Sequence, residues 1–178
     1  QLLIHPSMGF GSAHHASTRL CLRPLQRLDV QRKRVVDVGT GSGVLALAAA
    51  KLGAGRVLAI DADPDALAGA AVNLRLNRMP EAVELRLVDA ESPGSRIPER
   101  FDIVLANLTG FLLIRHVQTL CGLAAAGGAL VASGFEQDEA DGGRAAFKAA
   151  GWVQDLRLDE DSWTGLAFTS SPIRSTAR

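Results

Sequence analysis

The chain has 178 residues, 47% of them hydrophobic and 21% charged, and its 19 basic residues balance its 19 acidic ones. This composition is typical of one globular domain and excludes a disordered chain, while the neutral balance and the 4% share of aromatic residues argue against nucleic acid as a partner. No apolar run reaches the roughly 20 residues of a membrane span, and no signal peptide is recognisable, so we expect a cytoplasmic protein without membrane contact.

The first predicted element is a helix between His15 and Leu28. From Val35 onward, short β-branched runs alternate with stretches of helical spacing, which is the pattern of βαβ units and a parallel sheet. Asp63 is the expected N-cap of the helix that starts at Pro64. The expected strands are Arg34–Val38, Arg56–Asp61, Val83–Val88, Phe101–Ala106, Gly128–Ser133, Trp152–Leu158 and Ser162–Thr169, and the helices between them are Gly43–Leu52, Pro64–Arg78, Thr109–Ala125 and Glu136–Ala149.

The last two strands are separated by the acidic turn Asp159-Glu160-Asp161, which predicts an antiparallel hairpin at the edge of the sheet. We therefore expect an α/β fold with a doubly wound, mostly parallel, Rossmann-like sheet of seven strands. Within one domain, residues 1–33 are expected to form a covering loop and a helix, residues 34–170 the ligand-binding core, and residues 171–178 a frayed tail.

A glycine-rich loop follows the first strand and opens a helix. Gly39, Gly41 and Gly43 allow the backbone to come close to a nucleotide at the carboxyl edge of the sheet. The segment Gly41–Ala46 also fits the dinucleotide pattern G-x-G-x-x-G/A, so an NAD site and a site for S-adenosylmethionine both remain open at this point.

Three aspartates end successive strands beside this loop. Asp37 places a carboxylate next to the glycines, which suits the cationic S-adenosylmethionine better than a diphosphate. Asp61 is expected to accept hydrogen bonds from the ribose hydroxyls, and Asp89 to meet the adenine amino group. The alternative for each is a helix cap or turn former.

Two further segments indicate a family. The stretch from Gly9 to Leu22 and the turn Ala106-Asn107-Leu108, together with the glycine loop, resemble the ribosomal protein L11 methyltransferase family from about Pro6 to Thr169. Ser12, Ala13, His14 and Ala16 depart from that family's Phe-Gly-Thr-Gly-Thr-His-Pro-Thr-Thr stretch. The family also has a separate N-terminal domain that holds its ribosomal substrate, and nothing in these 178 residues corresponds to that domain.

The resemblance implies a class I methyltransferase fold and S-adenosylmethionine as the cofactor, with contacts at Thr18, Gly39, Asp61 and Asn107. Phe10 and Gly11 in the covering loop are further expected contacts. Asn107 is the leading catalytic candidate, with a structural turn as its alternative. His15 is the second, as a proton relay or as a residue that packs the loop.

We therefore expect methyl transfer to protein amines, either a lysine side chain or an N-terminal amine, with a ribosomal protein as the candidate substrate. Three alternatives stay open: a methyltransferase for a small molecule, an NAD-dependent oxidoreductase, and a cofactor-binding module without catalysis. No metal site is predicted from the four histidines, and Cys21 and Cys121 are interpreted as reduced thiols in helices.

Overall fold

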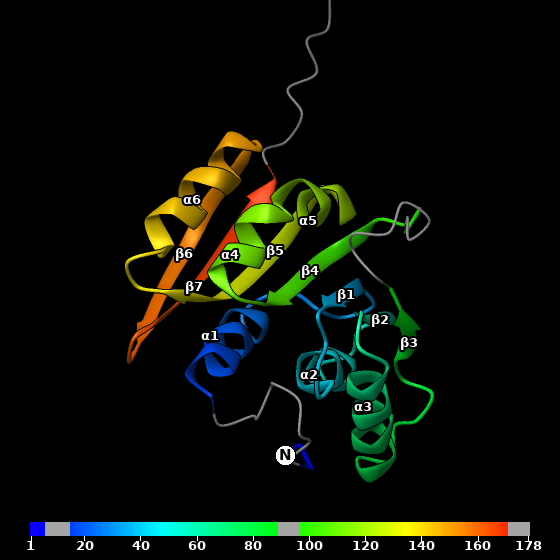
Figure 1. The fold of residues 1–178 in the computed structure, drawn as a ribbon. Helices are drawn as coiled ribbons and strands as arrows, with labels where there is room; N and C mark the ends of the chain where they lie inside the picture. Colours follow the sequence, from blue (N-terminus) through cyan, green and yellow to red (C-terminus); the bar gives the residue numbers. More distant parts are fainter. Residues whose placement is uncertain (6–14, 89–96, 171–178) are drawn as a thin grey trace, which may run out of the picture.

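The fold is a seven-stranded sheet covered by helices on both faces (Figure 1). The computed structural model describes residues 1–5, 15–88 and 97–170, so the predicted tail at 171–178 lies outside the described residues. The strand order is β3-β2-β1-β4-β5-β7-β6, in which β7 is antiparallel to both neighbours. The predicted fold class, including the antiparallel C-terminal hairpin, is confirmed.

The strands fall close to their expected positions. The first two, each with a buried β-branched centre, have the bounds that the sequence predicts, whereas β5 is longer at both ends. The strands are β1 (Arg34–Val38), β2 (Arg56–Asp61), β3 (Glu84–Leu87), β4 (Phe101–Asn107), β5 (Ala124–Glu136), β6 (Trp152–Glu160) and β7 (Trp163–Ser170).

The helices differ from expectation most clearly in two places, besides shorter ends at α1, α2 and α3. The predicted helix over 109–125 is two helices that meet at His116, whose φ of −101° and ψ of 15° interrupt the helical path. Glu136, the expected start of the last helix, is the final residue of β5 instead. The helices are α1 (Ala16–Leu25), α2 (Val44–Lys51), α3 (Pro64–Leu76), α4 (Gly110–Arg115), α5 (Val117–Leu123) and α6 (Ala140–Ala149).

The predicted hairpin turn is shorter than expected. Asp159 and Glu160 belong to β6, and Glu160 pairs with Trp163, which leaves a two-residue turn. Asp161 has a φ of 55°, the left-handed conformation that matches tight hairpin turns to the twist of the strands.

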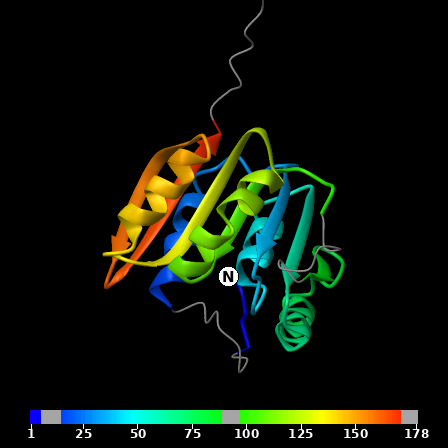
Figure 2. The same ribbon diagram turned by 45° about the horizontal axis from the view of Figure 1, so that its top comes forward.

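Alternate strand residues face two separate cores. Val35 and the strand side chains that point to the same face of the sheet pack against α1, α2 and α3. Val36 and the strand side chains on the opposite face pack against α4, α5 and α6. In the second core, the rings of Phe147 and Phe168 stack with their centroids 4.6 Å apart. Figure 2 shows α3 and α6 at opposite ends of the sheet. The result is a three-layer α/β/α domain.

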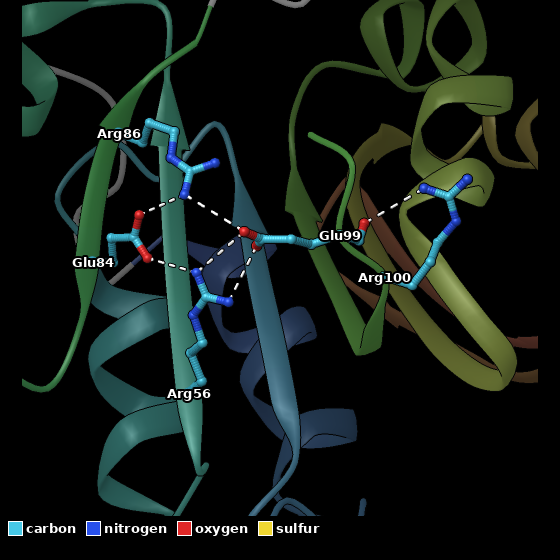
Figure 3. Close-up of polar contacts among 5 residues, drawn as sticks. All are labelled: Arg56, Glu84, Arg86, Glu99 and Arg100. Atoms are coloured by element: carbon cyan, nitrogen blue, oxygen red, sulfur yellow. Dashed lines mark hydrogen bonds and ion pairs between the residues drawn. The ribbon is translucent and has the colours of Figure 1, made fainter. Parts of the chain in front are cut away.

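Ion pairs link the start of β2 and two residues of β3 with Glu99, which lies two residues before β4 (Figure 3). Arg56 contacts Glu84 at 2.8 Å and Glu99 at 3.3 Å, and Arg86 contacts the same two carboxylates at 2.5 and 3.9 Å. We call these four residues the β3-edge cluster. Its side chains are about a quarter to two fifths exposed, so water screens their attraction.

Candidate functional site

The candidate site lies where β1 and β4 end side by side. The chain winds from β1 towards β2 and β3, and then returns to β4 on the other side of β1, so the strand order reverses between β1 and β4. In open α/β sheets this switch point, at the carboxyl ends of the strands, is where ligands bind. The glycine loop follows β1 there, and Asn107 is the last residue of β4.

The three loop glycines all have left-handed backbones, with φ values of 70° at Gly39, 52° at Gly41 and 78° at Gly43. Gly39 also packs tightly, because a Cβ atom at this position would lie 2.3 Å from Cδ2 of Leu108, the residue after Asn107. The left-handed backbone therefore favours glycine at position 39, and a larger residue would also displace the Leu108 side chain in the loop after β4.

Four backbone N–H groups of the loop donate within the protein. The pairs are Gly39 N and Thr40 N to Ile60 O (2.9 and 3.0 Å), Gly41 N to Asp61 Oδ2 (2.9 Å) and Gly43 N to Thr40 O (2.9 Å). These four N–H groups are therefore engaged within the protein and are not free for a pyrophosphate.

Asp37 lies under the loop and is 1% exposed. Its Oδ2 accepts hydrogen bonds from Thr40 Oγ1 at 2.7 Å and from Ala46 N at 3.2 Å, while its buried Oδ1 has no hydrogen-bond partner among the described residues. Burial raises the pKa of this carboxyl to about 6, although both hydrogen bonds oppose the rise. The carboxylate thus braces the loop and the start of α2 from inside the protein.

Asp61 connects the glycine loop to the end of β2. Besides accepting from Gly41, its carboxylate accepts through Oδ1 from Asp63 N at 3.0 Å, and it is partly exposed. A carboxylate has about four acceptor positions, so further hydrogen bonds to a ligand are compatible with both contacts. Asp63 accepts from Asp65 N at 2.8 Å, which confirms it as the N-cap of α3.

Thr18 and Asn107 come together from elements far apart in the sequence. Asn107 Nδ2 donates to Thr18 Oγ1 at 3.3 Å, and Thr18 is buried in α1. His15 is the N-cap of α1, with its Nδ1 2.8 Å from Ser17 Oγ and 3.3 Å from Ser17 N, and its ring lies edge-on to Trp163 at 5.0 Å. These contacts favour the packing interpretation of His15 over the proton relay.

The remaining expected contacts, Phe10, Gly11 and Asp89, lie outside the described residues. Sequence reasoning missed two residues that shape the site. Gly134 has a φ of 105°, and a Cβ atom there would lie 2.0 Å from Leu108 O, so glycine lets β5 approach the turn after β4. Asn73 is fully buried and donates to Ser42 O in the glycine loop at 2.9 Å.

A polar residue at a buried helix position is the signal that would have found Asn73. It stands between Ala70 and Leu74 in the apolar face of α3, where a side chain with no role would be apolar. Gly134 gives a weaker signal, because glycine inside a strand indicates a bulge without saying what approaches it.

Other features of the described chain do not add to this site. Two hollows, of about 160 and 340 Å³, lie near Ala129 in β5, towards the end of the sheet opposite the glycine loop. Residues 1–5, 15–88 and 97–170 contain no group of three His, Cys, Asp or Glu side chains that could hold a metal. In that same part of the chain, no helix combines the length and the apolar character of a membrane crossing.

The two cysteines lie in α1 and α5, as expected. Cys21 is buried, and burial together with the charge of Asp37 raises the pKa of its thiol. Burial raises the pKa of Cys121 to about 11. Both thiols are therefore protonated near neutral pH, which is unfavourable for a nucleophile.

Comparison with known proteins identifies relatives over nearly the whole chain. The family model "Ribosomal protein L11 methyltransferase (PrmA)" matches residues 1–171. Two proteins named ribosomal protein L11 methyltransferase are similar to the chain: one from Heliobacterium modesticaldum is 40% identical over 92% of the chain, and one from Geobacter sulfurreducens is 47% identical over 74% of it. The chain spans 51% and 42% of their lengths.

A crystal structure of a ribosomal protein L11 methylase from Lactobacillus delbrueckii subsp. bulgaricus is also similar to this fold. It superposes with a TM-score of 0.85 at 29% sequence identity, and the match covers 94% of this chain and 83% of the other.

Proposed function

Because the chain belongs to the ribosomal protein L11 methyltransferase family, we propose that it binds S-adenosylmethionine at the glycine loop and carries out methyl transfer to a protein amine. The proposed acceptor is a lysine side chain or the N-terminal amine of ribosomal protein L11, the protein named in its relatives. We expect the chain to encounter this acceptor in the cytoplasm.

The observation that carries the proposal is the hydrogen bond from Gly41 N to Asp61 Oδ2 at 2.9 Å. In the dinucleotide pattern considered above, Gly43 is the glycine that lets the backbone approach the pyrophosphate, and Gly41, with its N–H, forms the tight turn before it. Here that N–H is donated to a carboxylate, and the buried Asp37 adds a second anion beneath the loop. Asp61 suits either cofactor, because a dinucleotide site also has an acidic residue there for the ribose. An anion directly beneath the loop, however, disfavours a diphosphate and suits a cationic cofactor, so Asp37 favours S-adenosylmethionine over NAD.

The described side chains suit the parts of this cofactor. Asp61, partly exposed at the end of β2, would accept from the ribose hydroxyls, and Gly39 would let the backbone approach closely. Asp37, buried, would act through the loop that it holds rather than by contact. The cofactor supplies the methyl group.

Asn107 is the residue that we propose for the acceptor amine. Its Nδ2 donates to Thr18, so the amide is held in one orientation at the carboxyl end of β4, and its Oδ1 would accept a hydrogen bond from the amine. A free lysine has a pKa of about 10.4, so deprotonation near pH 7 costs about 4–5 kcal/mol. Holding both reactants in place contributes about 7–11 kcal/mol, which is enough without a dedicated base.

Calorimetric titration with S-adenosylhomocysteine and with NAD tests the cofactor. We expect the first to bind and the second not to. Asp61→Asn keeps the shape of the side chain but removes its charge, and hydrogen bonds to charged groups contribute about 1.5–3 kcal/mol. The variant should therefore bind S-adenosylhomocysteine about 10- to 100-fold more weakly. Binding of NAD alone would overturn the proposal.

Transfer of a labelled methyl group tests the acceptor. The chain is incubated with labelled S-adenosylmethionine and either purified ribosomal protein L11 or a low-mass metabolite fraction. We expect label in the protein, and a much lower rate for Asn107→Ala. Label only in the metabolites would support the alternative of a small-molecule acceptor, whereas cofactor binding without any transfer would indicate a binding module.

A further inference from the structure

The first five residues of the chain lie against α2 and α3, held by contacts that fix their backbone. Leu2 and Ile4 pack on the core that α1, α2 and α3 cover. Leu3 and His5 turn their backbones to α3, and the carbonyl of Gln1 accepts from Lys51 Nζ at 3.1 Å, at the end of α2. We call residues 1–5 the N-terminal strap.

Asn73 in α3 and Asn77, the C-cap of that helix, hold the strap. The side chain of Asn77 forms two hydrogen bonds with the backbone of Leu3: it accepts from Leu3 N at 2.9 Å and donates to Leu3 O at 2.6 Å. Asn73 accepts from His5 N at 2.7 Å. The spacing of four residues places both amides on one face of the helix, where they match alternate residues of an extended segment.

Asn73 differs from Asn77 because it has a second partner in the candidate site. Its Oδ1 accepts from the strap, while its Nδ2 donates at 2.9 Å to Ser42 O, in the loop between Gly41 and Gly43. The side chain is 0% exposed, and its amide group is shared between the strap and the glycine loop. The loop cannot move away from α3 without breaking a buried hydrogen bond, and the strap cannot leave the helix without breaking a partly buried one.

The glycine loop also packs directly on α3 beside this contact. A Cβ atom at Gly43 would lie 3.0 Å from Cβ of Ala70, one turn before Asn73. The loop therefore approaches α3 closely at Gly43 and is hydrogen-bonded to it at Ser42. Its position depends on the same helix that holds the strap.

We propose that Asn73 is a positioning residue that couples docking of the N-terminal strap to binding of the cofactor at the glycine loop. This rests on the proposed function, since the cofactor is the ligand of the loop. Coupling is reciprocal: a docked strap favours the binding-competent loop, and a bound cofactor holds the strap more firmly.

Amide hydrogen exchange measured by NMR on the whole chain tests the coupling, with S-adenosylhomocysteine as the probe. In the wild type, saturation with the probe should slow exchange at His5 N several-fold. Asn73→Ala should abolish this response and should weaken binding of the probe by about fivefold or more, the lower end of typical coupling between sites. Without any ligand, the same variant should speed exchange at Gly43 N.

Asn77→Ala is the matched control, because it loosens the strap at Leu3 without touching the loop. It should speed exchange at Leu3 N but, because Asn73 still holds both His5 N and Ser42 O, it should change exchange at Gly43 N much less than Asn73→Ala does in the absence of ligand. Equal effects of the two variants at Gly43 would contradict a special role for Asn73.

The wild type alone can also refute the coupling, so the test does not depend on either variant folding. Binding of S-adenosylhomocysteine with no change at His5 N would overturn the coupling and leave the proposed function standing. A wild type that does not bind S-adenosylhomocysteine at all would refute the proposed function and, with it, the coupling.

Discussion

At the scale of single residues, Asp37 shows how a charged group can serve a site without facing it. The carboxylate is buried, and it satisfies Thr40 Oγ1 and Ala46 N, which would otherwise lack partners under the loop. An ionised carboxylate with one oxygen unpartnered among the described residues is costly in such surroundings. This free-energy cost of ionising a buried carboxyl is the reason why the pKa of Asp37 is raised.

This pKa predicts an unusual dependence of stability on pH. Since the folded pKa of about 6 lies above the ordinary value of 3.8, the folded state holds the proton more tightly, and stability falls as pH rises between these values. The whole rise corresponds to about 3 kcal/mol, of which about 2 kcal/mol falls between pH 4.5 and 7.5. Asp37→Asn, which cannot ionise, should lack this loss.

Urea unfolding of both proteins at pH 4.5, 6 and 7.5 measures the difference. The stability of Asp37→Asn relative to the wild type should increase by about 2 kcal/mol over this range. A constant difference between the two proteins would show that the carboxyl ionises in the folded state as it does in the unfolded chain.

The sequence predicts the place of Asp61 at the end of β2 better than it predicts the inward orientation of Asp37 or the contacts of Asn73. An aspartate that ends a parallel strand is expected at the carboxyl edge of the sheet, close to the glycine loop, because parallel strands share that edge. Whether a carboxylate turns inward or outward depends on partners such as Ala46 N, nine residues away, which no local pattern fixes.

At the scale of elements, α1 is attached to the end of the sheet by the β6–β7 hairpin. Glu160 forms ion pairs with Arg19 and with Arg23, the latter at 2.8 Å, and the hydrogen bond from Arg19 is the main cause of the lowered pKa of Glu160. Gly165 of β7 lets the helix approach, since a Cβ atom there would lie 2.8 Å from Leu20 Cβ. The hairpin thus sets the position of α1, and with it that of Thr18.

Glu160→Gln should therefore weaken binding of S-adenosylhomocysteine several-fold. It should also raise KM for S-adenosylmethionine more than it lowers kcat. Glu84→Gln is the matched control, because it also removes two arginine contacts but in the β3-edge cluster, at the opposite end of the sheet (Figure 3). Equal effects of the two variants on KM would contradict positioning of Thr18 through α1.

Element boundaries are the part of the fold that the sequence predicts least well. The apolar spacing between Thr109 and Ala125 continues across His116, so the break between α4 and α5 has no local signal. The acidic residues Asp159 and Glu160 resemble a turn but belong to β6, because the partners that hold them, Thr164 and Arg19, are on other elements. Tertiary contacts override the local preference in both cases.

At the scale of the whole molecule, the alternation of strands and helices was sufficient to predict a parallel sheet with an antiparallel edge. Two cores on opposite faces follow from strands buried on both sides, which read as continuous apolar runs. The order of the strands was not predicted, since alternation alone permits several doubly wound orders.

The core under α6 should contribute to stability without contributing to the site. Phe147 is fully buried and stacks on Phe168, so Phe147→Ala should lower the free energy of unfolding by about 3–5 kcal/mol. Val153→Ala, at a side chain that is 52% exposed on neighbouring β6, is the control and should change stability little. Urea unfolding checks both, and a loss below 1 kcal/mol for Phe147→Ala would show that the core repacks around the missing ring.

The two edge strands of the sheet also affect whether copies of the molecule can pair through their strands. β3 has four residues and carries Glu84 and Arg86, and β6 alternates Asp155, Arg157 and Asp159 with its inward residues and is interrupted by an irregularity between Gln154 and Leu156. Charged side chains, short length and irregular register all oppose the addition of a foreign strand to an edge. Both edges are thereby protected against the strand pairing that starts aggregation, even at high protein concentration.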